Sequence, residues 1–211
     1  MPRAERRTQL LSVARGIIRK KGIGGLTMSG LAEAAGASKP VVYEHFENAE
    51  AVAVALLENY FETMIDLVAA RTANAQTLDE YLSIAIDTQF EYHRKDKLVV
   101  RSMTNGHSSS ERLNEAYLKL RDSSVETLEE LIRQQGASPE ASSVAGYVLW
   151  DVITGAVFEF GMRPDGEAAQ ENLKRMVLGA IHAIVPESRT KPVTPAKILA
   201  TARAFKQSRG E

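Results

Sequence analysis

The chain has 211 residues, of which 44% are hydrophobic, so it can bury a core within one or two domains. It contains no cysteine, which excludes disulfide bonds and thiolate metal sites. Neither an N-terminal apolar run nor an apolar span of about 18 residues is evident. We therefore predict a cytoplasmic protein with no signal peptide and no membrane partner.

The net charge of −1 is unevenly distributed along the chain. Residues 1–46 hold 8 Lys and Arg against 3 Asp and Glu, residues 47–185 hold 12 against 22, and residues 186–211 hold 6 against 2. A basic N-terminal part on an acidic body is typical of a module that contacts nucleic acid and is joined to a part that does not.

The first predicted element is a helix over residues 3–21, which Lys20, Lys21 and Gly22 end with cations in the last turn and a glycine after it. Its apolar residues repeat with helical spacing on one face: Leu10, Leu11, Ala14, Ile17 and Ile18.

Residues 27–46 predict two short helices joined by a tight turn, the arrangement of a helix-turn-helix. Thr27 is expected to cap the first helix, Gly36 to supply a positive φ in the turn, and Ser38 to cap the second helix through its hydroxyl. Pro40 is tolerated there because a first-turn N–H has no partner within the helix. The inward-facing residues are expected to be Leu31, Ala32, Ala35, Val41 or Val42, and Phe46.

The rest of the chain is predicted to be helical, which makes the fold class all-α. Asn48 is expected to begin a long helix, and Thr77 with Glu80 forms a capping box that opens a helix to about residue 95. The further predicted elements are a shorter helical piece at 96–103, a loop at 105–110, helices at 111–135, 139–161 and 165–185, and a short basic helix at 194–207.

The stretch from Thr27 to Phe46 resembles the DNA-binding domain of the TetR (tetracycline-repressor-like) family, at motif level over some 45 N-terminal residues. The matching positions are Thr27, Leu31, Ala32, Ala35, Gly36, Ala37, Ser38, Lys39, Val42, Tyr43, His45 and Phe46. The resemblance implies a ligand-released repressor that binds double-stranded DNA at a palindromic operator as a homodimer. Activation is not excluded. We expect a three-helix DNA-binding domain at 1–47, an effector-binding and dimerisation domain at 48–186, and a basic linker with a short helix at 187–211.

The same resemblance suggests roles on DNA. Tyr43 and His45 would contact phosphate, although His45 could be a plain surface histidine, and Lys39 would bind either phosphate or guanine. The remaining positions from which family members touch DNA are Thr27, Met28, Ala37, Ser38 and Pro40. One departure is Ala49, where the family usually has a phosphate-binding lysine. An N-terminal arm carrying Arg3, Arg6 and Arg7 could compensate.

Two further surfaces are predicted in the acidic body. An effector pocket would be lined by residues that are each alternatively explained by core packing: Phe61, Met64, Ile86, Phe90, Met103, His107, Tyr117, Tyr147, Trp150, Asp151, Thr154 and Phe158. A dimer interface, or alternatively an intramolecular core, is expected from the last two long helices through Val148, Val152, Gly155, Leu173, Met176, Val177, Ala180, Ile181 and Ile184. Gly146, Gly155 and Gly179 would permit close helix crossings.

Catalytic chemistry has no support in the sequence. The hydrolase, zinc-protease and nucleotide-binding motifs are absent, and the four histidines (45, 93, 107 and 182) are dispersed, so we expect no enzyme, metal or cofactor. The alternative to a DNA-binding regulator is a helical interaction or small-molecule-binding protein that keeps the helix-turn-helix without using it on DNA.

Overall fold

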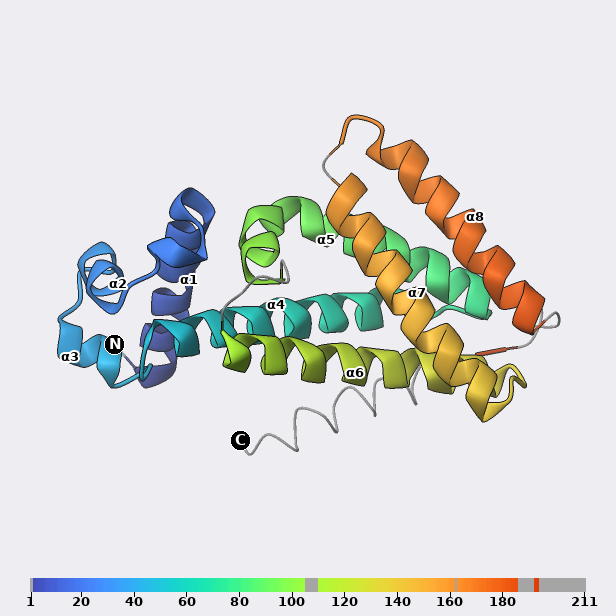
Figure 1. Cartoon of the computed structure of the whole chain (residues 1–211), viewed down its shortest axis with the longest axis horizontal. Coiled ribbons are helices and arrows are strands. Elements are labelled where there is room, and N and C mark those ends of the chain that lie inside the picture. Colours follow the sequence, from blue (N-terminus) through green and yellow to red (C-terminus); the bar gives the residue numbers. More distant parts are fainter. Residues whose placement is uncertain (1, 105–109, 162, 186–191, 194–211) are drawn as a thin grey trace. The chain divides into compact units, whose positions relative to one another are not determined.

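The computed structural model describes residues 2–104, 110–161, 163–185 and 192–193, with side chains left out over 95–104. Within these ranges the chain is helical, and the all-α prediction is confirmed (Figure 1). The elements are α1 Arg3–Lys21, a 3-10 turn η1 Ile23–Gly25, α2 Met28–Ala34, α3 Lys39–Tyr43, α4 Ala49–Thr72, α5 Leu78–Thr104, α6 Glu111–Gln134, α7 Pro139–Phe160 and α8 Gly166–Ile184.

Side-chain caps begin five of the described helices at the positions that the sequence indicates. In each case the cap residue accepts a hydrogen bond from the backbone N–H three residues later, over 2.8–3.2 Å: Thr27, Asn48, Thr77, Ser110 and Ser138. Each cap satisfies one of the N–H groups that a helix start leaves without an internal partner. These local contacts explain why the predicted helix starts agree with the observed ones.

Two predictions about helix ends are wrong in detail. Ser38 is the N-cap residue of α3, but its hydroxyl makes no capping hydrogen bond. The physical reason is that Pro40 removes one of the two N–H groups such a cap would use. The predicted break near residue 95 is also absent, because α5 continues to Thr104 as one helix.

The chain forms two compact units that are interleaved along the sequence. Unit 1 comprises residues 1–61 and 96–119, and unit 2 comprises residues 62–95 and 120–211. Since α4, α5 and α6 contribute to both, the expected domain limits at 47/48 and 186/187 remain predictions. In unit 1, buried apolar residues of the first helices form the core: Leu10, Ala14, Ile18, Leu31, Ala32, Ala35, Val42 and Phe46.

Unit 2 is built around an apolar core in which α5 and α8 contribute residues at helical spacing. Its buried members include Leu78, Leu82, Ile86, Phe90, Leu131, Leu149, Ile153, Leu173, Val177 and Ile181. Gly146 allows α6 and α7 to approach closely, because a Cβ there would lie 2.8 Å from Cγ of Glu129. By contrast, nothing lies within 4 Å of such a Cβ at Gly155 or Gly179.

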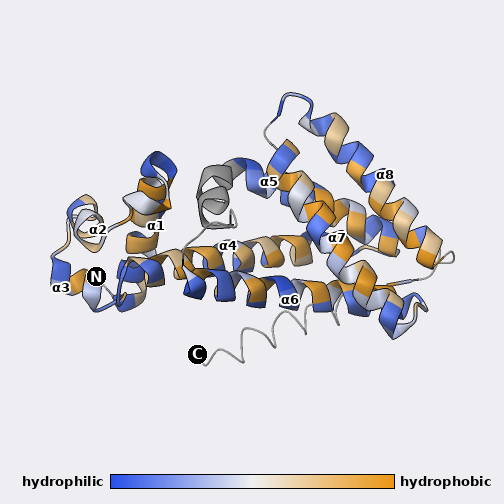
Figure 2. Cartoon of the chain, viewed as in Figure 1, coloured by the Kyte–Doolittle hydropathy of each residue, from blue (hydrophilic) through white to orange (hydrophobic). Residues whose placement is uncertain are grey.

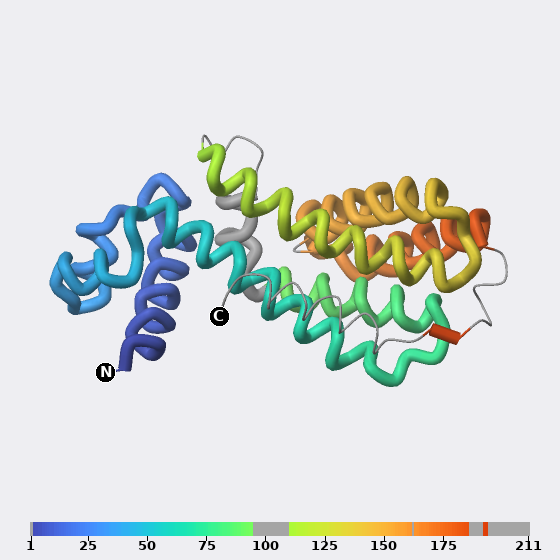
Figure 3. Tube along the Cα trace, turned by 90° about the horizontal axis from the view of Figure 1, so that it is seen from below, coloured from blue at the N-terminus to red at the C-terminus, as the bar shows by residue number. Residues whose placement is uncertain are grey.

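Residues 192–193 return to the connection between α4 and α5. The backbone N–H of Val193 donates to the carbonyl of Gln76 over 3.1 Å, and Val193 belongs to the core of unit 2. Figure 3 shows this short red segment beside the α4–α5 connection. The predicted helix at 194–207 lies outside the described residues.

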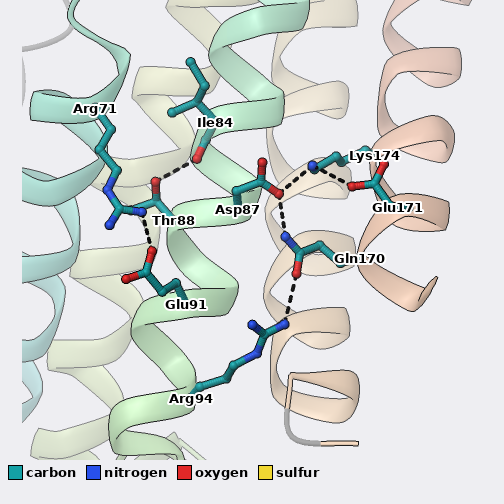
Figure 4. A network of polar contacts seen from close by, with 9 residues as sticks. All are labelled: Arg71, Ile84, Asp87, Thr88, Glu91, Arg94, Gln170, Glu171 and Lys174. Carbon is teal, nitrogen blue, oxygen red and sulfur yellow. Dashed lines mark hydrogen bonds and ion pairs between the residues drawn. The ribbon is translucent and has the colours of Figure 1, made fainter. Parts of the chain in front are cut away.

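A network of polar side chains joins α8 to α5. Lys174 Nζ lies 2.5 Å from Asp87 and 2.8 Å from Glu171, and Gln170 bridges Asp87 and Arg94 (Figure 4). Burial alone would lower the pKa of Lys174, but its contacts with Asp87 and Glu171 outweigh burial and raise that pKa. The network thus fixes one side of α8 on α5.

Helix α7 is long and apolar enough to cross a membrane by length and composition alone, contrary to the expectation from the sequence. Hydrophobic residues along it alternate with hydrophilic ones (Figure 2). Leu149, Ile153 and Val157 of this helix pack in the core of unit 2. Core helices of soluble proteins pass the same test, so the finding is weak evidence for a membrane span.

Candidate DNA-binding surface and effector cavity

The second helix of the predicted helix-turn-helix presents a polar surface. Ser38, Lys39 and Pro40 are exposed, and Tyr43 leaves 54% of its surface accessible. Val42 and Phe46 are buried on the opposite side, so they hold α3 against the rest of unit 1. Thr27 is exposed as well, whereas Ala37 and His45 are half-buried. The exposed residues therefore form one accessible face of α3, on the side away from the buried Val42 and Phe46.

The turn between α2 and α3 has the geometry that its glycine predicts. Gly36 adopts φ +60°, and the N–H of Ala37 donates to the carbonyl of Ala32 over 3.0 Å. This left-handed conformation ends α2 and is accessible to glycine without steric cost. The angle between the two helices therefore depends on a single backbone position.

Met28 does not belong to this surface. Only 8% of its surface is exposed, so it packs in the core of unit 1 and cannot reach a base edge. Its position directly after the Thr27 cap places it on the inward side of the first turn of α2. We therefore remove Met28 from the candidate DNA contacts.

Arginines of α1 bind the end of the second helix. Arg7 Nη1 donates to the carbonyl of His45 over 3.1 Å, and its guanidinium lies 4.4 Å from the centre of the Phe46 ring. Arg3 Nη2 donates to the carbonyl of Glu44 over 3.4 Å. Cations at a helix C-terminus satisfy free carbonyls and complement the helix dipole. Arg3 and Arg7 are thus engaged within the protein, whereas Arg6 pairs with Gln9.

Unit 2 contains a cavity between α4, α5, α6 and α7, with a volume of about 100 Å³. We call it the α4–α7 cavity. Its lining is Met64, Ile65, Val68, Ala69 and Thr72 of α4, Tyr81, Leu82, Ala85, Ile86 and Gln89 of α5, Ser123, Ser124, Thr127 and Leu128 of α6, and Trp150 and Ile153 of α7. An apolar wall with a few polar groups is the usual character of a small-molecule site.

Tyr81 is the only residue of this lining with a titratable side chain. Burial raises its pKa from 10.0 to about 12, while a side-chain hydrogen bond with Thr72 acts in the opposite direction. The phenol therefore stays neutral at physiological pH, and the described residues of the cavity wall carry no charge.

Three of the predicted pocket residues line the cavity: Met64, Ile86 and Trp150. The side chain of Met103 and the whole of His107 lie outside what the structure describes. The others are placed elsewhere: Phe61, Phe90, Tyr117, Tyr147, Asp151, Thr154 and Phe158.

Aromatic packing accounts for most of these displacements. The Phe61 ring meets that of Tyr117 edge-on at 6.2 Å within unit 1, Phe90 is fully buried in the core of unit 2, and Phe158 packs 4.7 Å from the His93 ring. Tyr147 lies on the surface, under the guanidinium of Arg121. Large rings fill space, so a cavity remains instead where short side chains such as Ala69 and Ala85 face one another.

Sequence reasoning missed most of the residues that line the cavity. A usable signal was present in the small polar residues on otherwise apolar helix faces, such as Thr72 and Ser123 with Ser124 and Thr127. Such residues leave room in a core and carry hydrogen-bonding groups, so they mark a cavity better than aromatic residues do.

The last two helices keep an apolar surface outside the core. Met176 leaves 66% of its surface accessible, Val148 53%, and Val152 and Ile184 39% each. Gly155 and Ala180 are exposed beside them, and Val144, which the sequence analysis did not select, is 66% exposed. We call Val144, Val148, Val152, Gly155, Met176, Ala180 and Ile184 the α7–α8 face. The predicted interface residues Leu173, Val177 and Ile181 are buried in the protomer's own core instead.

Within the described residues, no group of three or more His, Asp or Glu side chains is placed to hold a metal ion. His182 Nε2 lies 2.9 Å from Asp79 Oδ1, which explains a histidine on a helix otherwise used for packing.

A capped first helix, a glycine turn and an exposed second helix together define a helix-turn-helix protein. The model of the N-terminal region of bacterial regulatory proteins of the tetR family matches residues 10–56 of this chain. This match covers residues 10–56 alone, so it shows that the N-terminal region is similar to that of tetR-family bacterial regulatory proteins.

One relative is the HTH-type transcriptional activator FasR of Mycolicibacterium smegmatis, which is 33% identical over 98 residues. The match covers 46% of this chain and 44% of that protein, so less than half of the relative's length is matched.

Solved structures with a similar fold cover most of the chain. The fatty acid degradation regulator FadR of Bacillus halodurans aligns with a TM-score of 0.70 at 19% identity, over 82% of this chain and 95% of that one. A TetR-family transcriptional regulator of Streptomyces coelicolor aligns with a TM-score of 0.71 at 20% identity, over 86% and 90%. At these identities the likeness concerns the fold.

Proposed function

We propose that this chain is a sequence-specific, cytoplasmic transcriptional repressor that binds a palindromic operator as a homodimer and is released by a small-molecule effector. The observation that carries the proposal is the exposed face of α3, where Ser38, Lys39, Pro40 and Tyr43 stand free on a helix anchored from behind by Val42 and Phe46. A helix held in this way can enter the major groove without disturbing its own core.

The free hydroxyl of Ser38 supports direct base contact, since it is not used as a helix cap. Lys39 supplies a cation, and Tyr43 and His45 supply donors for phosphate oxygens. Thr27 and Ala37 complete the proposed contact surface.

The α7–α8 face supports the homodimer. Its apolar residues recur every three or four positions on each helix, and large apolar patches on soluble proteins mark interaction sites. A two-fold dimer through this face would present two copies of α3, and the spacing of the operator's half-sites would then reflect the dimer's symmetry.

The α4–α7 cavity supports effector control. An effector shifts DNA affinity only if it binds one state of the dimer better than the other. The name of the related FasR makes activation the alternative direction of regulation.

The test is selection from random duplex DNA with the purified protein at near-physiological salt. We expect enrichment of a palindrome. The variant Lys39→Ala should then reduce the slope of log affinity against log salt by about two units for a dimer, since each phosphate neutralised contributes about 0.9. Lys20→Ala, which removes an equal charge from the end of α1, serves as the control and should leave the slope unchanged. If Lys39 reads guanine instead, the selected sequence changes at one position in each half-site.

The second candidate is an interaction protein that does not use its helix-turn-helix on DNA. It predicts binding that is weak at low salt and indifferent to sequence, with no enriched palindrome.

A further inference from the structure

Among the residues that the structure describes, sixteen line the α4–α7 cavity, and none of these is Asp, Glu, Lys, Arg or His. Two arginines close to the wall in sequence are each paired with a carboxylate. Arg71 Nη1 lies 2.6 Å from Glu91, and Arg121 Nη2 lies 2.8 Å from Asp122. The described wall therefore offers no counter-ion to a charged ligand.

Most hydroxyl groups of the wall are already used. Thr72 donates to the carbonyl of Val68 over 2.7 Å, Ser124 to that of Leu120 over 3.0 Å, and Thr127 to that of Ser123 over 3.2 Å. These bonds remain within the helices that carry the residues. The three hydroxyls can accept a further hydrogen bond but have no proton left to donate.

Two polar side chains of the wall are still available. The amide of Gln89 and the hydroxyl of Ser123 make no hydrogen bond to any of the described residues. They come from α5 and α6, so the cavity has neutral donors and acceptors on two of its sides. An amide offers two donors and an acceptor, which suits a hydroxyl or a carbonyl group equally well.

The volume limits the size of the ligand. An apolar protein cavity of about 150 Å³ holds one benzene ring, and the α4–α7 cavity has about 100 Å³. A short alkyl chain fits this space.

We propose that the effector of this site is a small uncharged molecule, mainly apolar, with one hydroxyl or carbonyl group that hydrogen-bonds to Gln89 or Ser123, and that the site rejects carboxylates and amines. The inference rests on the proposed function, because it takes the α4–α7 cavity as the effector site. Its physical basis is that an ionised group loses its hydration when it enters a cavity with an apolar wall, and it finds no opposite charge there.

The experiment compares three probes with the same carbon chain: butan-1-ol, butanoate and butylammonium, each titrated into the full-length protein at pH 7. Trp150 is the only tryptophan of the chain and lies in the cavity wall, so its fluorescence reports binding at this site. We expect a saturable change with butan-1-ol and at least tenfold weaker responses with butanoate and butylammonium.

Two variants locate the effect, and a third serves as their control. Gln89→Lys places a cation in the wall and should reverse the preference, so that butanoate binds better than butan-1-ol. Asn114→Lys adds the same charge at an exposed position of α6 outside the cavity and should leave the preference as in the wild type. Ala69→Leu fills part of the cavity and should weaken butan-1-ol binding at least tenfold, with helical circular dichroism retained.

Equal or tighter binding of butanoate by the wild type overturns the inference, as does the absence of a saturable response to any probe. Gln89→Lys behaving like Asn114→Lys also overturns it. The selection of operator DNA is independent of these probes. A protein that enriches a palindrome but prefers butanoate leaves the proposed function standing and refutes only the ligand class.

Discussion

Arg7 is expected to position the recognition helix rather than contact DNA, and the substitution Arg7→Ala tests this. In the structure its guanidinium stacks on Phe46 at 4.4 Å and donates to the carbonyl of His45 at 3.1 Å. Exposed cation–π contacts contribute about 0.5–1 kcal/mol, and a cation at a helix C-terminus contributes about 0.3–1 kcal/mol. The substitution should therefore cost about 1–2 kcal/mol, which weakens DNA binding by at most about 5- to 30-fold per protomer.

The salt dependence of binding separates the two roles. Removing one phosphate-binding cation from each protomer lowers the salt slope by about two units, whereas a displaced recognition helix lowers affinity with no such change in slope. Arg7→Lys keeps the charge but loses the planar stacking group, so it should behave like Arg7→Ala if the role is positioning. Arg6→Ala is the control, because the Arg6 guanidinium hydrogen-bonds to Gln9 within α1 and, among the described residues, to no carbonyl at the end of α3. Rescue by Arg7→Lys together with a reduced slope in Arg7→Ala would refute the reasoning.

Three further predictions concern the dimer, pH and the turn. Met176→Arg, at the most exposed large hydrophobic side chain of α8, should weaken dimerisation more than tenfold in analytical ultracentrifugation, whereas Asn114→Arg should not. An unchanged dimer would exclude the α7–α8 face. Tyr81 has a folded pKa of about 12 against 10.0 unfolded, so its contribution to stability is present below pH 10 and is lost between pH 10 and 12. At pH 11 the wild type should have lost about 1.4 kcal/mol more than Tyr81→Phe in urea unfolding; parallel pH profiles would contradict this. Gly36→Ala should destabilise the protein by about 1–2 kcal/mol because φ is +60° there. As the control, Gly16→Ala inside α1 should stabilise it by up to about 1 kcal/mol. Melting temperatures of the two variants that shift in the same direction would refute the contrast.

The helix starts could be predicted from the sequence because a capping side chain binds a backbone N–H only three residues away. Asn48, Ser110 and Ser138 bind N–H groups in their own first turn, and no distant part of the chain takes part in those bonds. Ser38 shows the limit of this reading, since the capping pattern was present but Pro40 removed a donor. That outcome was itself visible in the sequence once the position of the proline was considered.

The side on which each apolar residue of α8 lies could not be read in this way. Leu173, Val177 and Ile181 are buried in the protomer, whereas Met176, Ala180 and Ile184 are exposed, although both sets have helical spacing. The sequence of a helix that is apolar on two sides does not show which side packs against its own chain. Packing against α5 and α7 decides it.

The sequence by itself determined the helix-turn-helix, because its turn glycine, cap and apolar spacing all act within twenty residues. It also determined the all-α class and most helix ends, for the same reason. The tertiary structure alone decided where the α4–α7 cavity lies, because side chains from four separate helices form its wall. It likewise decided that Met28 is core and that Arg7 binds the end of α3, since both depend on how separate helices pack.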